Sequence, residues 1–159
     1  MKILNKSILL LALTTVSIVG AQSQEDIDNY PDYAEAFSHG PHGGMTWEPI
    51  KIQTDDGYTL TMFHITGTKD NGLIEITKPA VILQHAFGSS AIAWLSTLTG
   101  QVPMAYNFAL MGFDIYLTNN SGVKYSQVHN EYTVDDCKFW LMDWIKWGTY
   151  DIPAAVKKI

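Results

Sequence analysis

Arginine is absent from the sequence, and cysteine occurs only once. All ten basic residues are lysines, set against sixteen acidic residues, so the net charge is −6. Because no guanidinium is available to grip phosphate with paired hydrogen bonds, and the balance is acidic, nucleic acid is not an expected partner. The single Cys137 excludes an intrachain disulfide and a CxxC redox site, and we expect it to be a small buried side chain.

Long apolar runs are also scarce. The main one, residues 8–19, has about a dozen residues, whereas roughly 20 are needed to span a bilayer. Lys2 and Lys6 precede this run, and small residues at 19–21 provide a signal-peptidase site. We therefore expect residues 1–21 to be a cleaved signal peptide and the exported chain to have no transmembrane anchor. In an exported chain, Asn119 is a candidate N-glycosylation site because Asn120 and Ser121 complete the sequon.

The remaining sequence has the composition of one packed domain, with 47% apolar and 12% aromatic residues. Residues 22–45 are first acidic and then rich in glycine, histidine and proline, which predicts a leader or linker before a domain at 46–159. His39 and His42 lie three residues apart in this stretch, but no further ligands converge on them. We therefore expect no metal there and no cofactor elsewhere.

The order of apolar segments predicts an α/β fold. Alternating residues at 47–65 around the Asp55-Asp56-Gly57 turn indicate a β-hairpin. Residues 80–83 form a short apolar run typical of a strand inside a sheet, and residues 103–111 a helix with Met104 and Met111 on its apolar face. A further strand follows at 113–117. Strand, helical crossover and strand make a parallel βαβ unit with a right-handed crossover.

The C-terminal third predicts two helices. The first begins at Thr133 or Asp135 and stops at Gly148, with Trp144 and Trp147 in the core. The second runs from 152 to 159 and is capped by Asp151.

Four separated motifs resemble the N-terminal part of the acid lipases, the gastric and lysosomal lipase family of α/β-hydrolases. They are TDDGYTL at 54–60, KP at 78–79 leading to LQHA at 83–86, GFDIYL at 112–117 followed by Asn119 and Gly122, and FW at 139–140 with YDIPA at 150–154. They occur in family order from about residue 47 to residue 159. The resemblance implies an incomplete α/β-hydrolase fold with an N-terminal hairpin followed by parallel βαβ units.

The resemblance also implies a function. Family members hydrolyse neutral lipid esters, such as triacylglycerols or cholesteryl esters, at a lipid–water interface through a Ser-His-Asp triad, and they are secreted or lysosomal. The loop at His85, Ala86 and Phe87 corresponds to the oxyanion loop, in which the Phe87 N–H would stabilise developing negative charge. Ala86 stands where the family has glycine, which places a methyl group in a turn of demanding geometry.

The catalytic serine is not found in this sequence. A nucleophile elbow needs G-x-S-x-G, and the only glycines four apart, Gly40 and Gly44, have a histidine midway between them. Ser89 and Ser90 lack an orienting group for a base at His85. We therefore expect the chain to stop before the nucleophile, acid and base, and to be inactive alone. The alternative is a non-catalytic lipid-binding or interaction protein derived from a lipase.

Overall fold

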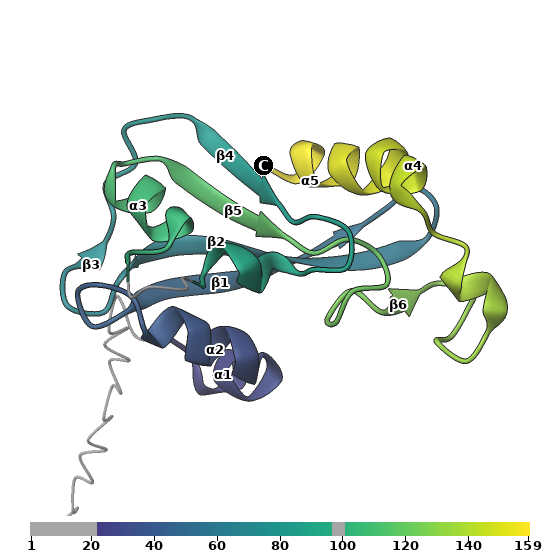
Figure 1. Cartoon of the computed structure of the whole chain (residues 1–159), viewed down its shortest axis with the longest axis horizontal. Coiled ribbons are helices and arrows are strands. Elements are labelled where there is room, and N and C mark those ends of the chain that lie inside the picture. Colours follow the sequence, from purple (N-terminus) through teal and green to yellow (C-terminus); the bar gives the residue numbers. More distant parts are fainter. Residues whose placement is uncertain (1–21, 97–100) are drawn as a thin grey trace, which may run out of the picture.

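The computed structural model describes residues 22–96 and 101–159, which form a mixed six-stranded sheet with helices on both faces (Figure 1). The expected signal peptide, residues 1–21, lies outside the described residues. Within the described ranges, no helix has the length and apolar character needed to cross a bilayer.

The predicted hairpin is confirmed and is longer than expected. Strands β1 (Met45–Gln53) and β2 (Tyr58–Thr68) pair antiparallel along their whole length. Gly57 adopts a φ of +101° in the turn between them, a conformation that an L side chain rarely adopts. The short strands β3 (Gly72–Leu73) and β6 (Val128–His129) also pair with β2.

The predicted βαβ unit is confirmed as well. Strands β4 (Ala80–Gln84) and β5 (Asp114–Thr118) pair in parallel, and the chain between them contains the 3₁₀ helix η1 (Ala91–Trp94) and helix α3 (Met104–Leu110). Strand β5 also pairs with β2, in the antiparallel direction, so the main sheet order is β1-β2-β5-β4. The fold class is therefore α/β with an antiparallel hairpin joined to a parallel pair.

Two details of this unit differ from expectation. Strand β4 lies at the sheet edge, so Ala80 is exposed and only Leu83 is fully buried. In α3, Met104 and Met111 point to solvent, whereas Ala105, Tyr106 and Ala109 face the core. The small alanines let the helix backbone approach the sheet closely, which the long methionine side chains would prevent.

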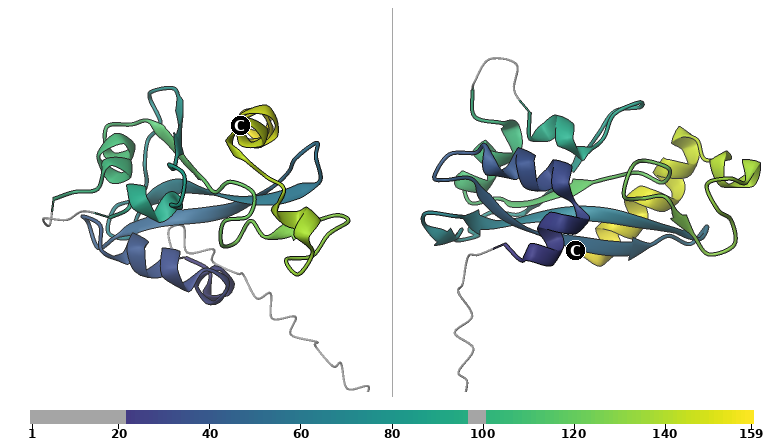
Figure 2. Two further views of the ribbon diagram at one scale, coloured as in Figure 1. Left: turned by 45° about the vertical axis from the view of Figure 1, so that its right-hand side comes forward. Right: turned by 90° about the horizontal axis from the view of Figure 1, so that it is seen from below.

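The leader or linker expected at 22–45 is wrong. Residues in this stretch form helices α1 (Gln24–Asn29) and α2 (Pro31–Ser38), which cover one face of the sheet (Figure 2). The ring of Tyr33 stacks on Phe63 with centroids 3.8 Å apart, and Phe37 stacks on Trp47 at 5.2 Å. The helices are too short to show a clear apolar period in the sequence, so their role depends on aromatic contacts made across the fold.

The C-terminal third also differs from expectation. It contains the 3₁₀ helix η2 (Cys137–Trp140) and then one continuous helical segment made of α4 (Trp144–Lys146), a π-helical turn (Trp147–Asp151) and α5 (Ile152–Lys158). Gly148 lies inside this segment and does not end a helix. Asp143 caps α4 by accepting a hydrogen bond from the Lys146 N–H.

Several side chains in this region lie where the sequence did not place them. Cys137 is exposed, not buried, and Trp144 is 76% exposed, not part of the core. The core contribution comes instead from Phe139 and Ala155, which pack with residues of β1 and β2 on the sheet face opposite α2. Tyr58 and Phe139 supply the buried aromatic rings of this cluster, and Trp144 lies outside it.

Candidate functional site

The candidate site lies where the parallel strands β4 and β5 end. Gln84 is in register with Thr118, so the loops that begin at His85 and Asn119 leave the sheet side by side (Figure 1). In open α/β sheets, ligands bind in the crevice beyond the carboxyl ends of the strands. The predicted oxyanion loop, residues 85–90, is therefore placed at the edge of the sheet where chemistry is expected.

His85 is a buried structural contact between the two loops. Its Nδ1 lies 2.9 Å from the Ala86 carbonyl, and its Nε2 accepts a hydrogen bond from the Asn120 N–H at 3.2 Å. These partners assign the proton to Nδ1 in a neutral ring. Burial lowers the pKa of His85, which favours the same neutral form, although the Ala86 contact opposes the shift. Both ring nitrogens are occupied, so His85 has no position free to activate a serine.

The two serines of the loop are not paired with His85. The Ser89 hydroxyl has its nearest partner in the Ser90 carbonyl, at 3.4 Å. A nucleophile needs a hydrogen bond to a base that a third group orients. The described geometry therefore agrees with the interpretation of Ser89 and Ser90 as loop residues.

The turn after His85 is closed by a backbone hydrogen bond. The Ser89 N–H donates to the Ala86 carbonyl at 3.2 Å, and Gly88 has a φ of +72°. Ala86 itself is not in the left-handed region, so its methyl group is compatible with this turn. Among the described residues, the Phe87 N–H has no hydrogen-bond partner, and the Phe87 side chain is 82% exposed.

Asn119, the residue of the predicted sequon, is buried in this fold. Its side chain is 0% exposed, and its Oδ1 accepts hydrogen bonds from the Tyr33 hydroxyl and the Ala91 N–H, each at 3.0 Å. Its Nδ2 is buried and has no hydrogen-bond partner among the described residues. The amide oxygen joins α2 and η1 to the end of β5, and glycosylation of Asn119 stays a prediction from the sequon.

Neighbouring polar side chains at the strand ends are hydrogen-bonded to one another. The Gln84 side chain donates to Asn120 Oδ1 at 2.7 Å and accepts from the Thr118 hydroxyl at 2.5 Å. These bonds join the ends of β4 and β5 directly. Paired buried polar groups give the loops one preferred arrangement, because any other arrangement leaves groups unsatisfied.

Asp151 is the other buried titratable group at this edge. Its carboxylate accepts hydrogen bonds from the Ser121 N–H at 2.7 Å and from the Ser121 hydroxyl at 3.1 Å. Burial raises the pKa of Asp151 to about 6, since the two hydrogen bonds only partly offset the loss of water. The expectation of a helix cap is wrong, because Asp151 makes no side-chain cap and lies within a continuous helical segment.

The raised pKa predicts a pH-dependent stability. In the unfolded chain an aspartate has a pKa near 3.8, so between pH 3.8 and about 6 only the folded chain keeps this proton. The contribution of this proton to the free energy of unfolding is therefore fully present below pH 3.8 and is lost as the pH rises through about 6. The loss is about 2–3 kcal/mol. Denaturant unfolding of the chain and of Asp151→Asn across this range measures it. Equal pH slopes for both proteins would contradict the assignment.

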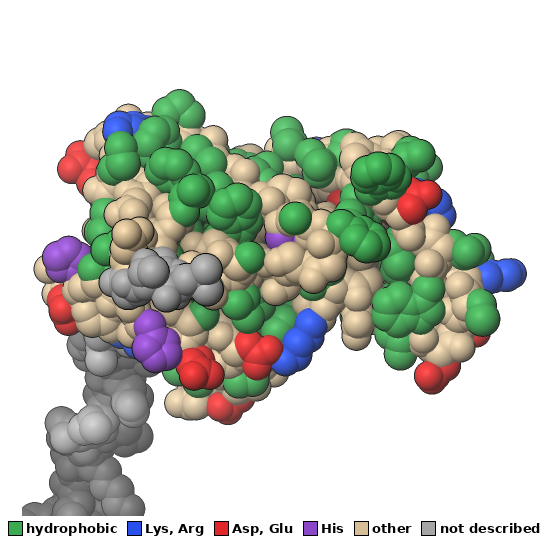
Figure 3. Space-filling model, in the orientation of Figure 1, with side chains coloured by type: hydrophobic (Ala, Val, Ile, Leu, Met, Phe, Trp, Pro, Cys, Tyr) green, Lys and Arg blue, Asp and Glu red, His purple; other side chains and the backbone are tan. Residues whose placement is uncertain are grey.

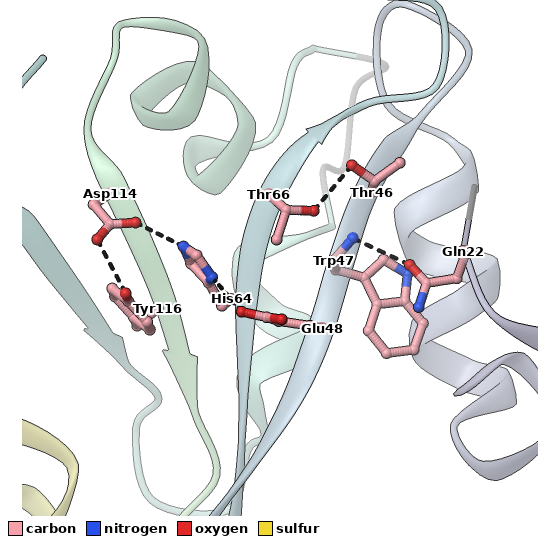
Figure 4. A network of polar contacts seen from close by, with 8 residues as sticks. All are labelled: Gln22, Thr46, Trp47, Glu48, His64, Thr66, Asp114 and Tyr116. Atoms are coloured by element: carbon pink, nitrogen blue, oxygen red, sulfur yellow. Dashed lines mark hydrogen bonds and ion pairs between the residues drawn. The ribbon is translucent and has the colours of Figure 1, made fainter. Parts of the chain in front are cut away.

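A second polar cluster joins three neighbouring strands away from this edge (Figure 4). His64 on β2 contacts Glu48 of β1 through Nδ1 at 2.9 Å and Asp114 of β5 through Nε2 at 2.7 Å. Its ring also stacks on Tyr116, whose hydroxyl donates to Asp114 at 3.0 Å. Burial, aided by Asp114, raises the pKa of Tyr116 to about 12. The carboxylates bind opposite ring nitrogens, so they hold the strands together without converging on one point.

Sequence reasoning missed Asp151 and His64 as members of polar clusters. The only signal for His64 was its place in an alternating strand, and its carboxylate partners are 16 and 50 residues away. It also missed an exposed apolar patch over the C-terminal helical segment, where hydrophobic side chains gather (Figure 3). The patch consists of Trp140, Leu141, Trp144 and Ile145.

Comparisons with known proteins identify relatives of this chain. Residues 41–98 match the model of the partial alpha/beta-hydrolase lipase region. The chain is 30% identical to rat gastric triacylglycerol lipase over 116 residues, which are 73% of this chain and 29% of the relative. It is 28% identical to human lysosomal acid lipase/cholesteryl ester hydrolase over 116 residues, again 73% of this chain and 29% of the relative.

A lipase of Caenorhabditis elegans extends the match. It is 31% identical over 153 residues, which cover 95% of this chain and 36% of the relative. The chain thus spans about a third of the length of these relatives. The matches and the α/β fold agree with the four motifs, and the chain belongs to the acid lipase family, corresponding to its N-terminal part.

Proposed function

We propose that this chain forms the N-terminal part of the catalytic domain of an exported lipid-ester hydrolase. Residues 1–21 direct export to the secretory or lysosomal lumen, and the substrates are neutral lipid esters such as triacylglycerols or cholesteryl esters. The relatives named for gastric triacylglycerol and lysosomal cholesteryl ester hydrolysis support this substrate class. The observation that carries the proposal is the Phe87 N–H, which has no hydrogen-bond partner within residues 22–96 and 101–159 and lies on a loop that His85 holds to the sheet.

The contribution of this chain to catalysis is electrostatic. When a serine attacks an ester carbonyl, negative charge develops on the carbonyl oxygen, and a fixed backbone N–H stabilises it without having to reorient. Phe87 supplies one such donor, and the residue after the nucleophile supplies the second. No G-x-S-x-G occurs in the 159 residues, so the nucleophile and its acid and base partners come from polypeptide outside this sequence.

Exposed aromatic side chains fit a lipid substrate at this edge. The Phe87 ring lies 5.7 Å from the ring of Trp147, and the exposed apolar residues of the patch lie earlier in the chain, at the end of η2 and in α4. In this patch the exposed indoles of Trp140 and Trp144 combine an apolar body with a polar N–H, which suits the boundary between lipid and water. The site therefore offers an apolar surface beside the charge-stabilising donor.

The first experiment measures ester hydrolysis by the full chain. Turnover of p-nitrophenyl butyrate is expected to equal the rate in buffer, because no activated nucleophile is present. The matched control is a double variant, Ser89→Ala with Ser90→Ala, which should behave identically. Turnover that a serine-directed phosphonate abolishes would contradict the proposal, because it would reveal a nucleophile within these residues.

The second experiment supplies the missing polypeptide. In a chimaera, residues 22–159, which include α1 and α2, replace the matching N-terminal segment of rat gastric triacylglycerol lipase. We expect this chimaera to hydrolyse tributyrin, with the unaltered rat enzyme as the reference. A chimaera that melts cooperatively but shows no hydrolysis would overturn the proposal, since the fold would be present without the function.

A further inference from the structure

We propose that the π-helical turn Trp147–Asp151 positions the oxyanion loop, with Asp151 acting through Ser121, Asn120 and His85. This inference rests on the proposed function of that loop and adds the element that holds it. Asp151 is a positioning residue in this scheme, because three other residues separate it from Phe87. The π-helical form is relevant because such turns are rare and occur often at functional sites.

The first step is the contact between the π-helical turn and the loop after β5. Asp151 Oδ2 accepts both the N–H and the hydroxyl hydrogen of Ser121, and both residues are at most 3% exposed. Two donors from one residue fix its backbone and its side chain together. The position of Ser121 is therefore tied to the helical segment.

The second step is the contact between that loop and the oxyanion loop. Asn120 precedes Ser121 in the chain, and its N–H donates to His85 Nε2. The same imidazole donates from Nδ1 to the Ala86 carbonyl, in the peptide unit whose nitrogen belongs to Phe87. The Ala86–Phe87 peptide carries the free N–H, so a movement of Ser121 is transmitted to this donor through two hydrogen bonds.

The third step is a direct contact at the other end of the π-helical turn. Trp147 lies four residues before Asp151, and its ring centroid is 5.7 Å from that of Phe87 and 6.3 Å from that of His85. The two ends of one turn thus reach the oxyanion loop by separate routes. A hydrogen-bonded route and an aromatic contact together restrict how far the loop can rotate.

The charge state of Asp151 is set by its surroundings. Asp56 in the turn between β1 and β2 is the charged group that faces it, and Tyr58 at the start of β2 lies nearby. Within residues 22–96 and 101–159, no ion pair joins Asp151 to a lysine or histidine. Burial raises the pKa of Asp151 and Asp56 adds to this effect, so the carboxylate gains its proton in a mildly acidic range, and the Ser121 hydrogen bonds change with it.

The experiment follows backbone amide signals of the full chain by nuclear magnetic resonance from pH 4.5 to 7.5. We expect the Ser121 and Phe87 amide shifts to change with one common midpoint near pH 6. Asp151→Asn should remove this inflection at Phe87, whereas Asp143→Asn, an exposed cap on the same helical segment, should retain it. An inflection at Phe87 that persists in Asp151→Asn would overturn the proposal, because the titration would then belong to His85.

A second measurement does not depend on the folding of that variant. Ser121→Ala removes only the hydroxyl contact and should speed hydrogen exchange of the Asn120 amide by about tenfold, which corresponds to one hydrogen bond of ordinary strength. Unchanged exchange at Asn120, or a wild-type Phe87 shift that is flat where Ser121 titrates, would also overturn the proposal.

These readouts separate this proposal from the proposed function. The amide signals require no ester hydrolysis, so they test the positioning network alone. Failure of the tributyrin assay with a responsive Phe87 amide would reject the hydrolase proposal and leave the network intact. Hydrolysis with an unresponsive Phe87 amide would reject only the role of Asp151.

Discussion

Replacing Phe37 by alanine is expected to lower the free energy of unfolding by about 3–5 kcal/mol, the usual cost of removing a buried aromatic ring. Phe37 is 0% exposed and packs against Trp47 and Tyr106, so its removal leaves a cavity between α2, β1 and α3. A small domain has only about 5–15 kcal/mol of net stability. We therefore expect a large fall in the midpoint of urea unfolding, followed by circular dichroism.

The matched control is the same substitution at an exposed phenylalanine. Phe87→Ala removes a ring that is 82% exposed, and the change in unfolding free energy should stay within about 0.5 kcal/mol. Similar losses for both variants would contradict the assignment of α1 and α2 to the core. This outcome would restore the interpretation of residues 22–45 as a linker.

The second large effect concerns the Phe87 N–H in the chimaera with rat gastric triacylglycerol lipase. Incorporation of phenyllactic acid at position 87 replaces the amide by an ester and removes only this donor. We expect kcat for tributyrin to fall by about 10²–10³-fold, the usual loss when one oxyanion donor is removed. KM should change little, because the donor acts mainly on the charge that develops in the transition state.

Two controls make this result specific. Phenylalanine incorporated at position 87 by the same route restores the N–H and should retain kcat, while 2-hydroxy-3-methylpentanoic acid at the exposed Ile76, whose N–H also has no hydrogen-bond partner among the described residues, tests the chemistry of replacement itself. A kcat that survives ester replacement at position 87 would remove Phe87 from the proposed oxyanion hole. A loss that appears equally at both positions would show that the replacement disturbs folding.

Most of the sheet could be predicted from local patterns. The hairpin was indicated by alternating residues around Gly57, and the parallel unit by two apolar runs separated by a helical stretch. Helices α1 and α2 could not be predicted, because Tyr33 and Phe37 become core residues only by stacking on strand residues 30 and 10 positions away. The helix end predicted at Gly148 was wrong for a similar reason. A glycine ends a helix only where the chain leaves the helix axis, and here the chain continues in helical form through Gly148.

The candidate site was likewise predicted only in part from the sequence. Motif order indicated the loop at His85 and Phe87, but the tautomer of His85 follows from Asn120, which is 35 residues away. Asp151 resembled a helix cap because aspartate before a helix commonly accepts from the first turn. Its actual partner, Ser121, lies 30 residues earlier, and no local pattern connects them.

The amino-acid sequence by itself determined the family, the α/β class and the absence of a nucleophile elbow, because these depend on residue types at short spacing. Only the tertiary structure decided which polar groups are buried together at the ends of β4 and β5. Burial removes water as an alternative partner, so the proton positions of His85 and Asp151 depend on groups that the fold brings from distant parts of the chain.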